Sequence, residues 1–219
     1  MNVLTVIDNF VPPSVERTGL RGIAALLRRL AARGCNLHVL TSVSRYADPT
    51  WPRWVADMQG AGLTIHARPQ PLRRWPRLGF LIERFSSAFE VMKLQRTVRF
   101  DIIHEFSSLP LLANRTALYG CFDAVTIHSL ITDNETWLAN PGWCVRWPDL
   151  VLCAGRLDYE ALARRRGHAA AYMPIGIDLA PVKEAVRAAT PRDLRKPVVL
   201  YIGPLDDRKG AGALTAAAP

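Results

Sequence analysis

Two basic residues near the end of the chain have the types and the spacing to hold a diphosphate. Arg208 and Lys209 follow a short apolar run, residues 198–202, and precede a segment typical of a helix start. Cations beside a helix N-terminus, where backbone N–H groups are exposed, attract phosphate oxygens. Gly203 opens the loop between the run and the two cations, and we include it in the predicted site. A solvated turn gives the same pattern, so this segment alone is a weak indication.

A histidine is the last residue of each of two apolar runs. His128 ends the run 124–128, and His104 ends the run 100–104. A histidine at the carboxyl end of a parallel strand faces the ligand crevice, where its ring can bond to a sugar hydroxyl or a phosphate oxygen. The alternative is a packed histidine that bonds to backbone. The two interpretations have equal weight for His128, and for His104 we favour the packed one.

The first loop, residues 8–19, leads into an amphipathic helix. The dipole and the free N–H groups of a helix N-terminus favour an anion, and Gly19 permits a ligand to approach the backbone closely. No G-x-G-x-x-G follows the first strand, so the loop is not the dinucleotide fingerprint. On its own, an ordinary loop and helix start is the favoured interpretation.

Most of the net charge of +9 lies between residues 68 and 99, which hold eight basic and two acidic residues. The densest part contains Arg73, Arg74, Trp75 and Arg77. Basic residues interleaved with aromatic ones suit an interfacial helix on an anionic membrane. A solvated helix with one core face is the competing and slightly favoured interpretation. No nucleic-acid recognition motif accompanies the charge, so we expect no nucleic-acid partner.

Alternating strands and helices must position these residues. Apolar runs predict the strands, and apolar residues at helical spacing predict the helices. Strands are expected at 3–7, 36–41, 63–67, 100–104, 124–128, 150–154, 170–173 and 198–202, and helices at 20–31, 51–60, 79–98, 157–166 and 182–189. In the helix 79–98 the large apolar residues, among them Phe89 and Met92, are expected mostly on one side, and a Pro- and Arg-rich loop is expected over 68–77.

This alternation predicts an α/β fold: an open, doubly wound (Rossmann-like) parallel sheet with helices on both faces. Ligands of such sheets bind at the carboxyl ends of the strands. Gly176 and Asp178 lie in one of the loops expected at that edge.

The composition excludes several classes of protein. With 49% hydrophobic and 21% charged residues, the 219-residue chain is globular. The four cysteines are scattered without a C-x-x-C pair, so neither a disulfide framework nor a metal site is expected. The first ten residues lack a basic n-region, and no apolar stretch is long enough to span a bilayer. We therefore expect a cytoplasmic protein, peripheral on the inner face of the membrane if the basic segment binds lipid.

Seven segments, taken in order, resemble the motifs of family 4-type glycosyltransferases, which have the GT-B fold. They are VPPSVERTGLRG, LLRRLAARGCNLHVLTS, FDIIHEFSS, AVTIHSL, PDLVLCAGRLDYEALARRRG, YMPIGIDL and VVLYIGPLDDRKGAGALTAAA. Each is weak alone, but together they follow the family's order from the first residues to the last. The resemblance implies a hexosyltransferase that moves a sugar from a nucleoside-diphosphate sugar to an acceptor, retains the anomeric configuration and needs no metal or other cofactor.

The resemblance also implies roles for individual residues. Gly19 would lie beside the diphosphate or the acceptor, His128 would contact the transferred sugar, and Lys209, with Arg208 near it, would neutralise the leaving diphosphate. Thr18 stands where the family has a glycine, and its side chain would leave a ligand less room to approach the backbone. Pro204 replaces a family arginine and removes both a cation and a backbone donor.

On this resemblance, residues 1–190 form the acceptor-side domain and residues 191–219 form a linker and the start of a donor-binding domain. The chain then looks truncated, and we expect no sugar transfer by it alone. A lipid-linked or membrane-surface acceptor is expected from the basic segment. The alternative is a non-catalytic module that binds a membrane or a partner subunit. A Rossmann-type epimerase is disfavoured, because the sequence lacks both the glycine fingerprint and a Tyr-x-x-x-Lys pair.

Overall fold

The computed structural model describes residues 1–8, 10, 19–43, 49–69, 76–107, 123–130, 148–166, 170–174 and 179–188. The chain divides into two units, Met1–Asp178 and Leu179–Pro219. The sheet belongs to the first unit. Helix α7 (Leu179–Ala188) belongs to the second.

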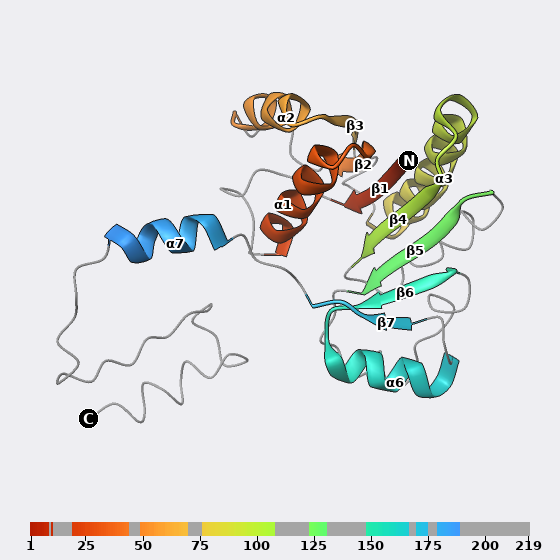
Figure 1. Cartoon of the computed structure of the whole chain (residues 1–219). Helices are drawn as coiled ribbons and strands as arrows, with labels where there is room; N and C mark the ends of the chain where they lie inside the picture. Colours follow the sequence, from red (N-terminus) through yellow and green to blue (C-terminus); the bar gives the residue numbers. More distant parts are fainter. Residues whose placement is uncertain are drawn as a thin grey trace. The chain divides into compact units, whose positions relative to one another are not determined.

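Seven parallel strands form one sheet with the order β3-β2-β1-β4-β5-β6-β7 (Figure 1). Their bounds are β1 Asn2–Asp8, β2 Asn36–Val43, β3 Leu63–Pro69, β4 Ile102–Ser107, β5 Val125–Leu130, β6 Leu150–Cys153 and β7 Ala170–Tyr172. Because β1 pairs with both β2 and β4, the order reverses between β1 and β4. The predicted doubly wound parallel sheet is confirmed, while the expected strand at 198–202 lies outside the described residues.

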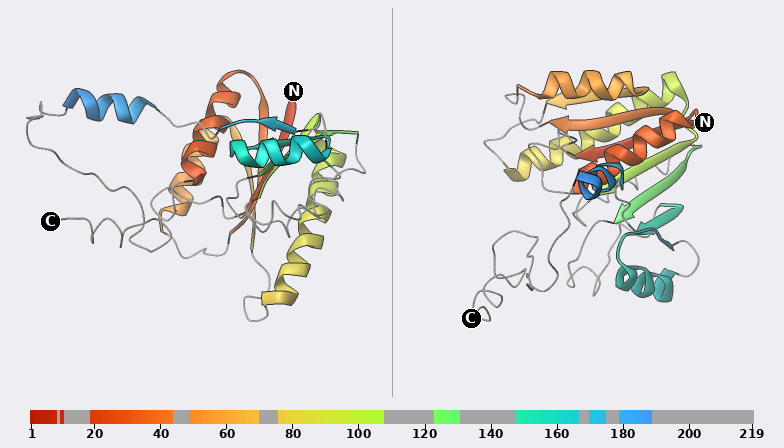
Figure 2. Two further views of the ribbon diagram at one scale, coloured as in Figure 1. Left: turned by 90° about the horizontal axis from the view of Figure 1, so that it is seen from below. Right: turned by 60° about the vertical axis from the view of Figure 1, so that its left-hand side comes forward.

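Helices α1 (Gly19–Ala32) and α2 (Trp51–Gly60) cover one face of the first strands (Figure 2). Their buried residues and those of β1, β2 and β3 form one apolar cluster. It contains Val3, Ile7, Phe10, Ile23, Ala24, Leu27, Leu37, Val39, Trp51, Trp54, Met58, Leu63 and Phe106. The spacing of these residues along α1 is the amphipathic pattern read from the sequence.

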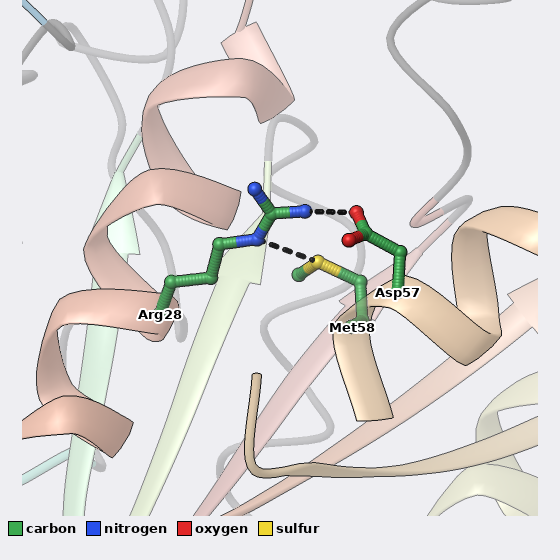
Figure 3. A network of polar contacts seen from close by, with 3 residues as sticks. All are labelled: Arg28, Asp57 and Met58. Carbon is green, nitrogen blue, oxygen red and sulfur yellow. Dashed lines mark hydrogen bonds and ion pairs between the residues drawn. The ribbon is translucent and has the colours of Figure 1, made fainter. Parts of the chain in front are cut away.

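Arg28 ties the two helices together. Its guanidinium donates from Nη2 to the carboxylate of Asp57 and from Nε to the sulfur of Met58, which lies 3.3 Å away (Figure 3). The ion pair is partly exposed, so it stabilises the fold by less than about 1 kcal/mol. The main stabilisation here is the burial of the Met58 side chain.

Helix α1 ends at Ala32, and two residues later the backbone of Gly34 adopts a left-handed conformation. Gly34 has φ of 84°, and its N–H donates to Ala31 while the N–H of Cys35 donates to Leu30. This is the Schellman arrangement, which glycine adopts at low cost.

Helices α3 (Pro76–Val98) and α6 (Arg156–Arg166) cover the other face. Ala88 and Val91 of α3 pack on a second apolar cluster with Leu4, Val6, Leu40, Phe100 and Ile103. Helix α6 packs on β6 and β7, where the rings of Tyr159 and Tyr172 lie 6.4 Å apart. Glu105 and His128, described below, lie on β4 and β5 in the sheet.

The sequence did not show which apolar residues of α3 face the sheet. Phe89 and Met92 are exposed, and the buried face instead carries Ser87, Ala88 and Val91. The C-terminal end of α3 is held in place by Gln95, whose side chain accepts a hydrogen bond from the N–H of Phe100 and donates one to the carbonyl of the same residue. This clamp sets the rotation of α3, so the smaller apolar residues face the sheet.

The expected loop over 68–77 was too long. Strand β3 continues to Pro69 and α3 begins at Pro76, so Arg77 lies in the first turn of a helix. Proline is tolerated at both places, because β3 is an edge strand and the first helical residue needs no N–H partner.

Candidate functional site

The reversal of strand order between β1 and β4 marks the expected ligand edge of this sheet. The strands around it end at Asp8, Ser107 and Leu130. The chain segments that follow these ends, residues 11–18, 108–122 and 131–147, lie outside the described residues. At this edge, the structure therefore describes only the last residues of the strands.

His128 lies nearer the middle of its strand than expected. Strand β5 continues two residues further, to Leu130, so His128 does not project from the strand end. Its side chain is only 1% exposed. The ring is therefore buried within the strand and is not exposed at the end of it.

Glu105 is the partner of His128 on the neighbouring strand. The two residues are paired in the β4–β5 register, and His128 Nδ1 lies 3.5 Å from Glu105 Oε2. Both side chains are 1% exposed, and Val6 and Val151 flank the pair in the same register row. At this distance the attraction is mainly electrostatic, because an ordinary N–H···O bond is shorter than about 3.2 Å. The carboxylate favours a proton on Nδ1.

The sequence interpretation missed Glu105. The signal for it is present in FDIIHEF, where an acidic residue replaces the apolar residue that alternation requires two positions after Ile103. A carboxylate in such a position is seldom buried unless it has a polar or charged partner. The partner lies on β5, the next strand of the chain, and only the register between the two strands shows that the residues are paired.

His104 lies on the opposite face of the sheet. Its Nε2 is 2.7 Å from the hydroxyl of Ser129, and its ring lies 4.1 Å from that of Phe106. Burial is the main cause that lowers the pKa of His104 to about 4, with a further lowering by His128 and a partial compensation by Glu105. His104 is thus neutral at physiological pH, and its contacts account for it as a packed residue.

The turn from β6 into α6 holds a second buried acid. Asp158 is 5% exposed in the first turn of α6, and its carboxylate fills the space that a Cβ on Gly155 would need. Burial, and to a lesser degree the charge of Asp158, raises the pKa of Cys153 to about 11. Because a carboxylate already occupies this helix N-terminus, the turn is not suited to bind an anion.

The other predicted site residues are only partly described. Gly19 is the first residue of α1, and Arg77 lies in the first turn of α3. The remaining ones lie outside the described residues: Thr18, Arg73, Arg74, Trp75, Gly176, Asp178, Gly203, Arg208 and Lys209. The structure therefore neither brings these residues together nor separates them.

Within the described ranges, no group of three or more His, Cys, Asp or Glu side chains is arranged to hold a metal ion. The closest approach to one is His38 Nδ1 and His66 Nε2, which lie 2.9 Å apart in stacked rings. In the same part of the chain, no helix is both long and apolar enough to cross a membrane.

A parallel sheet that reverses at β1 and β4, with helices on both faces, defines a Rossmann-like domain of the kind found in GT-B glycosyltransferases. The sequence model of Glycosyltransferase Family 4 matches residues 21–181, which is more than half of the chain. The chain therefore belongs to that family. No curated protein sequence matches it.

Solved structures agree with this fold. A glycosyltransferase from Rickettsia africae ESF-5 superimposes with a TM-score of 0.55 and 11% identity, over 88% of this chain and 50% of its own. CalG4, the calicheamicin glycosyltransferase, superimposes with a TM-score of 0.52 and 12% identity, over 80% of this chain and 53% of its own. The N-terminal domain of a Candida albicans trehalose-6-phosphate phosphatase superimposes with a TM-score of 0.54 and 13% identity. The match covers 84% of this chain and 50% of its own. This chain thus spans about half the length of each.

Proposed function

We propose that this chain is the acceptor-side part of a retaining hexosyltransferase that uses a nucleoside-diphosphate sugar. The observation that carries the proposal is the match of residues 21–181 to Glycosyltransferase Family 4. The parallel sheet supports it, because its reversal point is the place where such folds bind ligands.

In this proposal the cations of the segment 203–210 neutralise the leaving diphosphate. Lys209 carries this role, with Arg208 beside it and Gly203 opening the loop. Charge stabilisation of a departing anion needs no metal ion when fixed cations supply it. Gly176 and Asp178 complete the donor side, and Thr18 and Gly19 border the acceptor.

His128 contacts the transferred sugar in this proposal, and Glu105 is its positioning residue. The buried carboxylate, 3.5 Å from Nδ1, keeps the ring in one tautomer and orientation. In this proposal Nε2 is the ring atom that bonds to a sugar hydroxyl.

The acceptor is proposed to be a lipid-linked sugar or another molecule at a membrane surface. The excess of basic residues between 68 and 99 supports this acceptor class. We further propose that the 219 residues alone transfer no sugar, because the solved relatives use chains about twice as long.

The test is label transfer by the protein isolated from its source cells. The protein is incubated with radiolabelled UDP-, GDP- and ADP-hexoses and with membrane lipids, in the presence of EDTA. We expect label to move from one donor to the lipid fraction, and the product anomer, assigned by NMR, to match that of the donor. The purified 219-residue chain serves as the comparison and should transfer no label. Absence of donor consumption by the isolated protein contradicts the proposal.

A further inference from the structure

The solvent face of α3 carries two large apolar side chains next to each other. Phe89 is 63% exposed and Met92 is 38% exposed, whereas Ala88 and Val91 on the same turns are buried. Residues three apart on a helix are neighbours, so Phe89 and Met92 form one apolar spot. Single exposed apolar residues need no explanation, but an adjacent pair on one helix face points to an interaction surface.

Two cations share this face with the apolar pair. Lys93 and Arg96 are exposed, and their spacing from Phe89 and Met92 places all four residues on the side of α3 opposite Val91. The acidic residue of this half of the helix, Glu90, is only half-exposed and interacts with His66 on the flank of α3. Among the described residues of α3, the face therefore combines apolar and positive side chains without a negative one.

We propose that this α3 surface, made of Phe89, Met92, Lys93 and Arg96, docks on an anionic membrane. The apolar pair enters the headgroup region while the two cations pair with lipid phosphates, which is the pattern of interfacial helices. The inference deepens the proposed function and rests on it in one respect, because docking brings the sheet edge to a lipid-linked acceptor. It concerns residues several turns beyond the Arg73–Arg77 part of the chain.

Charge complementarity selects the membrane over a second copy of this chain. A two-fold dimer through the α3 surface would bring Lys93 and Arg96 of one copy against the same residues of the other. Like charges in a desolvated contact repel each other, and no acid of this face is available to compensate within the described helix. An anionic lipid surface supplies the missing negative charge.

Co-sedimentation of the 219-residue chain with phosphatidylcholine vesicles, with and without phosphatidylglycerol, tests the proposal. We expect binding only to the anionic vesicles. The double variant K93E/R96E should lower the partition coefficient at least about 30-fold, because each basic residue near an anionic surface contributes about fivefold. The variant F89S/M92S should also lower it, and circular dichroism should show that both variants remain folded, since all four side chains are exposed.

Matched variants make the test specific. R33E/R53E reverses two exposed arginines on the α1–α2 side with the same change in net charge, and V186S removes a 69% exposed apolar side chain from α7. Both should bind like the unmodified chain. Equal loss of binding in R33E/R53E, equal binding to neutral vesicles, or no binding at all would overturn the proposal. So would a lipid-free dimer that F89S/M92S dissociates.

The vesicle assay contains no sugar donor. A failure of membrane binding therefore leaves the proposed sugar transfer standing, and a failure of sugar transfer leaves the docking surface standing.

Discussion

At the scale of single residues, the Glu105–His128 pair is the most informative feature of the sheet. Two titratable side chains occupy adjacent strands at 1% exposure, although the residues that flank them in the register row, Val6 and Val151, are apolar. Desolvation of such groups is costly, and their mutual attraction offsets part of the cost. A fold needs no such pair for stability, so its presence in the sheet supports the positioning role proposed for Glu105.

We predict that Glu105→Gln lowers the free energy of unfolding by about 1 kcal/mol, because it removes the buried carboxylate that lies 3.5 Å from His128 Nδ1 and attracts the proton there. Urea denaturation measures the change. His128→Gln and the double variant complete a mutant cycle, and a coupling of about 1 kcal/mol or more is expected between residues in direct contact. A coupling near zero would show that the two side chains do not interact as the structure places them.

His104 provides a prediction about pH. Its pKa is about 4 in the folded chain and 6.5 in the unfolded one, so the unfolded state binds more protons between these values. The contribution of His104 to stability is therefore complete above pH 6.5 and is lost as the pH falls towards 4. The loss amounts to about 3 kcal/mol at the acid end.

His104→Gln should make the acid limb of the stability curve shallower, because glutamine retains a hydrogen-bonding group for Ser129 and does not titrate. His38 and His66, whose pKa values burial also lowers, still contribute to the remaining acid sensitivity. Urea midpoints from pH 7 to 4 measure the slope. An unchanged slope would mean that His104 titrates alike in the folded and unfolded chains.

At the scale of elements, the sequence determined most of the fold. The bounds of α2, Trp51–Gly60, match the expectation, and every strand expected within the described residues is present. Their order in the sheet was not predicted, because the hand of the crossovers decides the face on which each helix lies and not which strands are neighbours. Strand ends were less predictable: β5 runs two residues past His128, because backbone pairing with Ser107 and Cys153 continues there.

The face of α3 shows why some features could not be predicted. Phe89–Met92 and Ser87–Val91 both have helical spacing, so periodicity alone does not choose between them. The choice depends on tertiary contacts: the clamp between Gln95 and Phe100, and the bonds from the Asn2 side chain to the carbonyls of Val98 and Arg99. Glu105 escaped prediction for the same reason, since its partner lies on another strand.

We predict that two neighbouring residues of α3 contribute very differently to stability. Val91→Ala should lower the free energy of unfolding by about 2 kcal/mol, because it removes two buried methyl groups and leaves a cavity against Leu4 and Val6. Met92→Ala should change it by less than about 0.5 kcal/mol, because that side chain is exposed. Chemical denaturation compares the two. A larger loss for Met92→Ala would show that α3 is rotated.

At the scale of the whole molecule, family membership and fold are established, and the chemistry is proposed. The family match covers residues 21–181, whereas the cations assigned to the diphosphate lie beyond it, at 208 and 209. In the proposed function the described sheet, with His128, belongs to the acceptor side, and the cations at 208 and 209 neutralise the leaving group.

The central claim is that Lys209 stabilises the leaving diphosphate, and the most direct measurement is the rate of nucleoside-diphosphate release by the protein isolated from its source cells. We predict that Lys209→Ala lowers this rate about 100-fold or more, as removal of a group that stabilises transition-state charge does, while its circular dichroism spectrum stays unchanged. Arg53→Ala, which removes an exposed cation on α2, serves as the control and should release diphosphate at the unmodified rate. An unchanged rate in Lys209→Ala would contradict the account.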